Sequence, residues 1–138
     1  MKKLYVLLIL LLLLCGCSNK VILNCNFVDS SSILGSKSII DIITFKNNKI
    51  VSFERDINFS LHSDLNKDVK SIYKTVKLEA KSLKKYIGGK YRISKYSDSV
   101  KMSFNSKRIG NLIYIGIDGN YGYDDVLGVY SNLGFECK

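Results

Sequence analysis

Hydrophobic and polar positions alternate along much of the first half of the chain. Residues 38–46 are rich in Ile, Thr and Phe, and residues 49–59 resume this character after Asn47 and Asn48. In the second segment, polar positions alternate with apolar positions that share one face, namely Val51, Phe53, Ile57 and Phe59. Asn tolerates positive φ, so the Asn pair suits a two-residue turn. This pattern predicts an antiparallel hairpin with one face exposed to water.

A helical period follows the predicted hairpin. Over residues 64–87, apolar side chains recur every three or four positions, at Leu65, Val69, Ile72, Val76, Ala80, Leu83 and Ile87. Ser63 is a suitable N-cap, and Gly88 and Gly89 supply the left-handed backbone that ends helices. We expect this amphipathic helix to lay its apolar stripe across one face of the sheet.

Shorter patterns complete the predicted domain. Strands are expected at residues 25–28, 91–96, 100–104 and 111–117, and a closing helix is expected at residues 124–133 before Gly134. The order predicts an α+β fold: an antiparallel sheet of about five strands, with one long helix packed on one face and a short C-terminal helix. The length of 138 residues and the 46% hydrophobic content indicate one globular domain and exclude a disordered chain.

The N-terminus carries a separate signal. Lys2 and Lys3 precede an unbroken apolar run over residues 4–14. Eleven helical residues span about 17 Å, whereas the hydrocarbon core of a bilayer is about 30 Å thick. A secretory signal peptide therefore fits this segment better than a membrane-spanning helix does.

The residues Leu14, Cys15, Gly16 and Cys17 follow this run and resemble a bacterial lipobox. The resemblance implies that diacylglycerol is attached to the Cys17 sulfur and that the chain is cleaved after Gly16. The expected organisation is a signal peptide at 1–16, a lipid-anchored tether at 17–24 and a single domain at 25–138, on the extracytoplasmic face of the cell membrane. The alternative is an uncleaved anchor or ordinary signal peptide, with Cys17 as a plain thiol.

The remaining cysteines then form a simple pair. Cys15 leaves with the signal peptide and Cys17 carries lipid, so Cys25 and Cys137 remain in the domain. In an exported protein, such a pair indicates a disulfide, although two free thiols or a redox pair are alternatives. We expect no metal site and no cofactor, because the only histidine is His62 and two Cys with one His supply too few ligands.

Several of these features together resemble the small YehR-like bacterial lipoproteins. They are the lipobox, Cys25 soon after it, the hairpin TFKNNKIV at residues 44–51, the central helix and the terminal LGFECK at residues 133–138. The resemblance implies an α+β fold and membrane anchoring, and it carries no catalytic residues across. Residues 109–118 depart from it, because they form an apolar segment where the resemblance implies a polar, helix-prone one.

Positive charge is the strongest hint of a binding partner. The formal net charge is +9, and six lysines lie opposite the apolar stripe of the predicted helix: Lys67, Lys70, Lys74, Lys77, Lys81 and Lys84. Such a ridge would attract anionic lipid or an anionic wall polymer. The alternative is a solvated face that keeps the protein soluble. Nucleic acid is not expected as a partner, because export places the ridge in another compartment.

Candidate catalytic chemistry is sparse. Residues 118–125 resemble a calcium loop, but Gly122 and Tyr123 stand where an oxygen ligand and a glycine are required. An envelope enzyme acting on wall polymer or lipid would need converging carboxylates, for which the candidates are Asp118, Asp124 and Glu136. We expect instead a non-enzymatic binding or accessory module at the cell envelope. Its partner would be an envelope protein or an anionic polymer.

Overall fold

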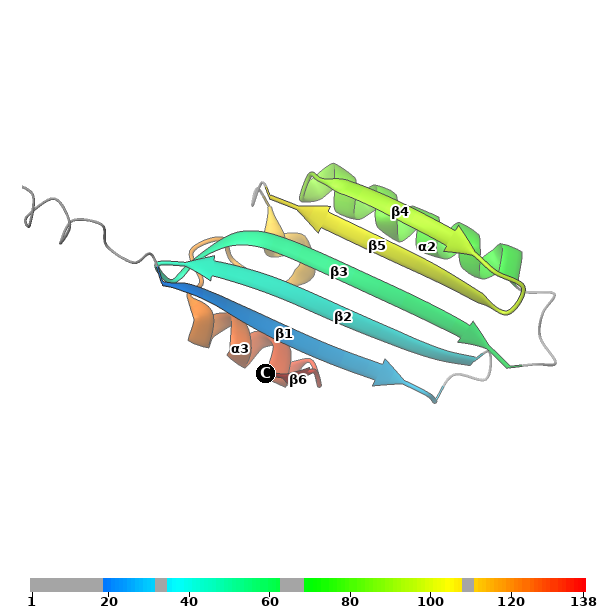
Figure 1. Ribbon diagram of the computed structural model, residues 1–138, viewed down its shortest axis with the longest axis horizontal. Helices are drawn as coiled ribbons and strands as arrows, with labels where there is room; N and C mark the ends of the chain where they lie inside the picture. The colour runs from blue at the N-terminus through cyan, green and yellow to red at the C-terminus, as the bar shows by residue number, and fades with distance from the viewer. Residues whose placement is uncertain (1–18, 32–34, 63–68, 108–110) are drawn as a thin grey trace, which may run out of the picture.

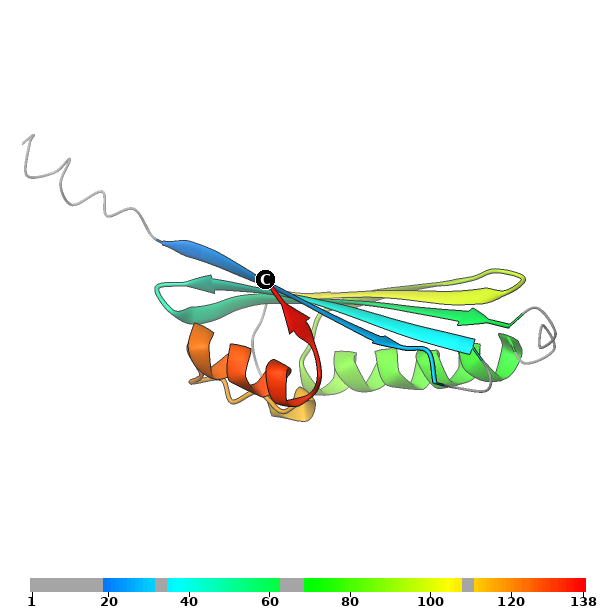
Figure 2. The ribbon, with the colours of Figure 1, turned by 90° about the horizontal axis from the view of Figure 1, so that it is seen from below.

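The computed structural model describes residues 19–31, 35–62, 69–107 and 111–138. They form a six-stranded antiparallel sheet in the order β4-β5-β3-β2-β1-β6 (Figure 1). Both α-helices cover the same face of this sheet (Figure 2). The α+β class is therefore as expected, with six strands in place of about five. None of the described helices has the length and hydropathy needed to cross a membrane.

The first three strands form a continuous meander: β1 (Lys20–Asp29), β2 (Gly35–Lys46) and β3 (Lys49–Leu61). Asn47 and Asn48 connect the last two with φ values of 52° and 59°. Both residues are therefore left-handed, as a type I′ hairpin turn requires. The turn expected from the Asn pair is confirmed.

One side chain of this hairpin lies on the opposite face from the one expected. The strand register shifts between Thr44 and Phe45, which pair with Ser52 and Ile50 and leave Val51 as an extra residue. Such a bulge reverses the side-chain alternation beyond it. Ile50 is consequently buried, and Val51, expected in the core, is 38% exposed.

The first domain boundary also differs from the prediction. Strand β1 begins at Lys20, and the Asn47 N–H donates a hydrogen bond to the Asn19 carbonyl oxygen at 3.2 Å. The segment expected as a tether up to residue 24 is therefore paired in the sheet from residue 20 onward. The local sequence pattern did not indicate this pairing, because residues 20–24 pair with residues 42–46, which lie 18 to 26 positions away. The signal peptide and Cys17 lie outside the described residues.

The long helix α2 (Val69–Tyr86) packs against β4 (Lys90–Lys95) and β5 (Ser99–Ser106). Its buried residues match the predicted stripe: Val69, Ile72, Val76, Ala80 and Leu83. The expected N-cap and first turn, residues 63–68, lie outside the described residues. Gly88 and Gly89 end the helix with φ values of 79° and 116°, as predicted.

The strand expected at residues 111–117 is wrong. Leu112–Ile115 form a short 3₁₀ helix, η2, which Gly116 ends with a left-handed backbone. Leu112 and Ile117 are buried, whereas Ile113 between them is 66% exposed. The neighbouring strand β5 is already paired on both sides, with β3 and with β4, so this segment has no edge beside β5 to join. Leu112 and Ile117 are buried outside the sheet instead.

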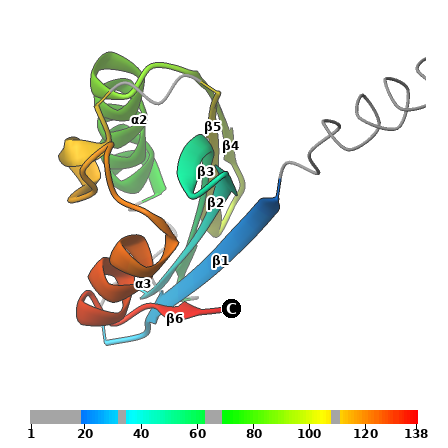
Figure 3. The ribbon, with the colours of Figure 1, turned by 90° about the vertical axis from the view of Figure 1, so that its left-hand side faces the viewer.

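The chain closes with α3 (Tyr123–Asn132) and the two-residue strand β6 (Glu136–Cys137). Gly134 has a φ of 81°, and the Phe135 N–H bonds to the Tyr130 carbonyl oxygen, which together end the helix. Strand β6 then pairs with the middle of β1 at the sheet edge (Figure 3). The predicted closing helix is observed, and the chain after it pairs with the sheet.

Candidate functional site

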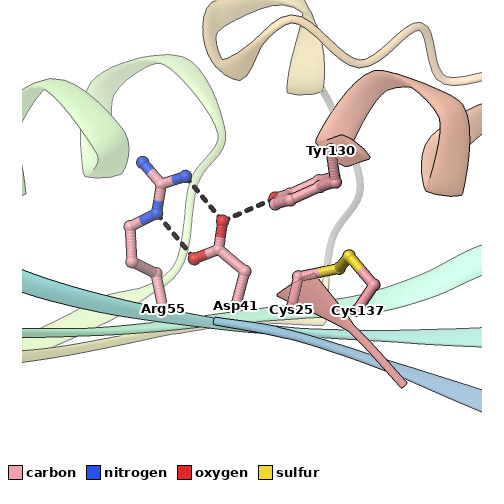
Figure 4. The surroundings of a disulfide bond; sticks show 5 residues. All are labelled: Cys25, Asp41, Arg55, Tyr130 and Cys137. Carbon is pink, nitrogen blue, oxygen red and sulfur yellow. Dashed lines mark hydrogen bonds and ion pairs between the residues drawn. A yellow bond between two sulfur atoms is a disulfide. The ribbon is translucent and has the colours of Figure 1, made fainter. Parts of the chain in front are cut away.

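A buried polar cluster lies between the sheet and α3 (Figure 4). Asp41 on β2 is fully buried, and its Oδ1 and Oδ2 accept hydrogen bonds from Arg55 Nε at 2.7 Å and Nη2 at 2.6 Å. The Tyr130 hydroxyl on α3 donates to Asp41 Oδ2 at 2.5 Å. Side chains from the β2–β3 hairpin and from α3, which is much later in the sequence, therefore meet at one carboxylate.

Burial and charge shift the pKa values of both Asp41 partners. Burial lowers the pKa of Arg55, but the hydrogen bonds and negative charge of Asp41 outweigh this effect, so the pKa rises and the guanidinium stays charged. Burial raises the pKa of Tyr130, and the Asp41 charge raises it further. The phenol therefore stays neutral and acts as a hydrogen-bond donor.

The raised pKa of Tyr130 predicts a loss of stability in alkali. The unfolded chain ionises this tyrosine near pH 10, before the folded chain does. Its contribution is therefore complete below about pH 10 and declines as the pH rises above that value. Urea unfolding between pH 8 and pH 11 should show a steeper decline for the wild type than for Tyr130→Phe. Equal slopes in the two proteins would contradict the assignment.

The disulfide lies beside this cluster. Cys25 on β1 and Cys137 on β6 are directly opposite in the register and are bonded to each other, as the sequence analysis expected. Two backbone hydrogen bonds join the next pair: Asn24 N–H to the Lys138 carbonyl at 3.0 Å, and Lys138 N–H to the Asn24 carbonyl at 2.9 Å. Cys25 also faces Asp41 across β1 and β2. The covalent bond and the polar cluster thus fasten the C-terminus to the same part of the sheet.

The chemistry of this cluster is structural. Asp41 and Tyr130 are 0% and 1% exposed, so no substrate reaches the carboxylate or the phenol. The carboxylate already accepts three hydrogen bonds, which stabilise its charge. Among the described residues, no group of three or more His, Cys, Asp or Glu could hold a metal ion.

The lysine ridge predicted on the long helix lies on the outer face of α2. Five of its members are exposed: Lys70, Lys74, Lys77, Lys81 and Lys84. The sixth, Lys67, lies outside the described residues. Glu79, on the same helix, lies 3.9 Å from Arg55 and 4.0 Å from Lys37, both on the sheet. The acidic residue of α2 is therefore directed toward the sheet, which leaves the outer face basic.

The other candidate residues lie on separate elements. Asp118 is in the turn after η2, where its Oδ1 accepts a hydrogen bond from the Asn120 N–H at 2.8 Å. Asp124 is exposed in the first turn of α3, and Glu136 is exposed in β6 at the sheet edge. His62 is exposed at the end of β3. These carboxylates therefore lie on three separate elements and do not converge on one pocket among those of the described residues.

The sheet face opposite the helices is uncovered by any described element (Figure 2). One depression on it, of about 520 Å³, is lined by polar residues that include Glu54, Asp56 and Arg92. A second, of about 240 Å³, is lined by Asn58, Lys101 and Ser103 among others. The side-chain oxygen of Asn58 is buried and has no hydrogen-bond partner among the described residues. The accessible polar groups on this face are exposed side chains such as Asp56, Arg92 and Lys101.

The buried cluster was not predicted from the sequence. One signal was present: Asp41 interrupts an Ile-Ile-Asp-Ile-Ile run, and Arg55 stands between Phe53 and Ile57 at core-facing positions of the next strand. A lone charge at a core position calls for a buried partner, because unpaired buried charges are costly. The two residues are directly opposite in the observed register. The third member, Tyr130, lies within the segment that was expected to form the closing helix.

Comparisons with known proteins match no family model and no curated protein. In fold, the chain is similar to the NMR structure of a protein from Streptococcus pneumoniae TIGR4, with a TM-score of 0.52 and 10% identity. The match covers 90% of this chain and 88% of that chain. At this identity the likeness shows the fold alone. The resemblance to YehR-like lipoproteins stays a prediction, because none of these comparisons bears on it.

Proposed function

We propose that this protein is an extracytoplasmic lipoprotein, anchored to the cell membrane through diacylglycerol on Cys17. The support from sequence is the order of two lysines, an apolar run, Gly16 and Cys17. Its folded domain acts as a non-enzymatic binding or accessory module at the cell envelope.

The disulfide is the observation that carries this proposal. Cys25 and Cys137 are bonded to each other across 112 residues of sequence. Disulfides persist in oxidising compartments and are rare in the cytosol, so the bond supports export. Cys15 and Cys17 then remain as the cysteines of the leader region, and Cys17 is at the position that the lipobox resemblance implies for lipid.

Replacing Cys17 with serine tests the anchor. We expect Cys17→Ser to lose incorporation of labelled fatty acid, because serine offers no sulfur for the thioether. A smaller share of the variant should enter the detergent phase. The measurement is metabolic labelling followed by detergent phase separation of solubilised cells. The matched control is Cys15→Ser, which removes a neighbouring thiol and should label like the wild type. Labelling that persists in Cys17→Ser would overturn the proposal.

The outer face of α2 favours a second candidate function, the binding of an anionic envelope polymer. The five described lysines of the ridge are exposed along this helix, and Glu79 is directed toward the sheet. Lysines near an anionic surface each contribute about 1 kcal/mol to binding. Salt-sensitive retention on immobilised teichoic acid, lost in a Lys70→Glu, Lys74→Glu, Lys77→Glu variant, would establish this role.

A further inference from the structure

We propose that one end of the sheet is a contact surface for the anionic headgroups of phospholipids. This surface, the hairpin end, comprises Lys20, Val21 and Ile22 at the start of β1 together with residues 46–49 and Val51 of the β2–β3 hairpin (Figure 1). The inference rests on the lipid attachment at Cys17 proposed above. It adds which part of the domain faces the membrane and what chemistry it contacts.

The length of chain between Cys17 and β1 limits how far the hairpin end can lie from the bilayer. Cys17 precedes Lys20 by three residues, which span at most about 11 Å when fully extended. The Asn19 carbonyl already accepts a hydrogen bond from the Asn47 N–H, so the hairpin lies beside the point where the chain leaves the sheet. A lipid on Cys17 therefore holds the hairpin end close to the bilayer, at a separation comparable to the screening length of about 8 Å at physiological salt.

Charge at the hairpin end is complementary to an anionic membrane. In the strand register, Lys20 faces Lys46, and Lys46 faces Lys49. All three are exposed. Like charges directly opposite in a sheet are destabilising, and phosphate groups between them would relieve this repulsion. Each lysine near such a surface raises membrane partitioning about fivefold.

Apolar side chains accompany these lysines. Val21 and Ile22 are 45% and 54% exposed, and the bulge residue Val51 is 38% exposed. Exposed apolar groups next to basic ones are the combination that binds the interfacial region of membranes, where buried apolar area and electrostatic attraction add. The bulge that turns Val51 outward thus contributes to this surface.

Acidic residues near this end lie in the other layer. The Tyr123 N–H at the start of α3 donates to Asn48 Oδ1 at 2.8 Å, which brings Asp124 and Asp125 toward the hairpin. Asp125 accepts a hydrogen bond from the Gly122 N–H at 2.9 Å, and Asp124 is exposed. Because α3 lies in the helix layer (Figure 2), the lysine-bearing sheet layer is the side that faces the headgroups.

The α2 lysines lie farther from the anchor. The helix packs on β4 and β5, and two strands separate β1 from β5. Three inter-strand spacings amount to about 14 Å, beyond the screening length. The hairpin end and the α2 ridge are therefore separable surfaces that can be tested against each other.

Depth-dependent quenching tests this orientation. The full protein, purified from membranes, carries a fluorophore on Asn47→Cys at the hairpin or on Ser97→Cys in the β4–β5 turn at the far end. It is reconstituted into phosphatidylcholine vesicles with or without phosphatidylglycerol, together with a spin-labelled lipid that quenches the fluorophore. We expect stronger quenching at position 47 than at position 97, and an increase at position 47 when phosphatidylglycerol is present. Equal quenching at the two positions would overturn the inference.

Two matched charge variants identify the contact. One replaces Lys20, Lys46 and Lys49 with glutamine, and the other replaces Lys70, Lys74 and Lys77 with glutamine, so each removes three charges. The first should lose the phosphatidylglycerol-dependent increase at position 47, and the second should retain it. The reverse result would place the contact on α2 and overturn the inference.

Vesicle flotation separates the lipid anchor from the orientation. A protein that fails to float lacks the anchor itself, whereas one that floats with equal quenching at the two positions refutes the orientation alone.

Discussion

Replacing Asp41 with alanine should lower the free energy of unfolding by about 3–5 kcal/mol. The substitution leaves the Arg55 guanidinium, whose side chain is 13% exposed, without its carboxylate partner. It also removes the carboxylate that accepts the hydrogen bond of the Tyr130 hydroxyl. Tyr130 is 1% exposed, so no water replaces this acceptor. Urea unfolding of the oxidised protein at pH 7 measures this loss.

Three variants separate charge from packing in this cluster. Asp56→Ala removes an exposed aspartate from β3 and should change stability by less than about 0.5 kcal/mol. Tyr130→Phe removes one hydrogen bond to a charged group, a loss of about 1.5–3 kcal/mol. A double variant, Asp41→Leu with Arg55→Leu, removes both charges. It should be more stable than Asp41→Ala, because it leaves no unpaired buried charge. An Asp41→Ala protein as stable as Asp56→Ala would contradict the structural role of the cluster.

Removing the disulfide is the second change with a large expected effect. The bond closes a loop with a sequence separation of 112 residues. In the chain-entropy model, a loop of this length contributes about 4.7 kcal/mol by restricting the unfolded chain. A Cys25→Ala, Cys137→Ala variant should lose most of this stability in equilibrium unfolding. The C-terminal strand β6 contributes two residues to the sheet and should be the first element released.

The reduced wild type is the matched control for the disulfide. With excess reductant it should unfold at the same urea concentration as the double variant, and its intact mass should increase by two hydrogens. An unchanged unfolding midpoint after reduction would show that the bond adds no stability. Cys25 and Asp41 are directly opposite on neighbouring strands, so the disulfide and cluster variants should combine non-additively.

Expectations based on local spacing agree well with the structure. Three features follow from patterns within a single segment of the chain. They are the Asn47-Asn48 turn, the buried stripe of α2 and the glycines that end α2 and α3. The strand predicted at residues 111–117 was wrong for a physical reason. Alternating Ile residues are compatible with a strand, but β5 is paired on both sides and has no free edge for another partner. The predicted burial of Val51 was wrong because a bulge depends on the register of two strands, which the sequence of a single strand does not encode.

The sequence by itself determined the α+β class and the main helix with its basic face, and it predicted the bond between Cys25 and Cys137 that the structure contains. The class and the helix follow from the periodicity of the segments and from their order along the chain. Only the tertiary structure decided that Asp41, Arg55 and Tyr130 share one buried site and that Lys20, Lys46 and Lys49 are neighbours. The reason is that strand register and layer packing bring together residues as distant in sequence as Asp41 and Tyr130, which are 89 positions apart, whereas a local pattern reports only which face of its own element is apolar.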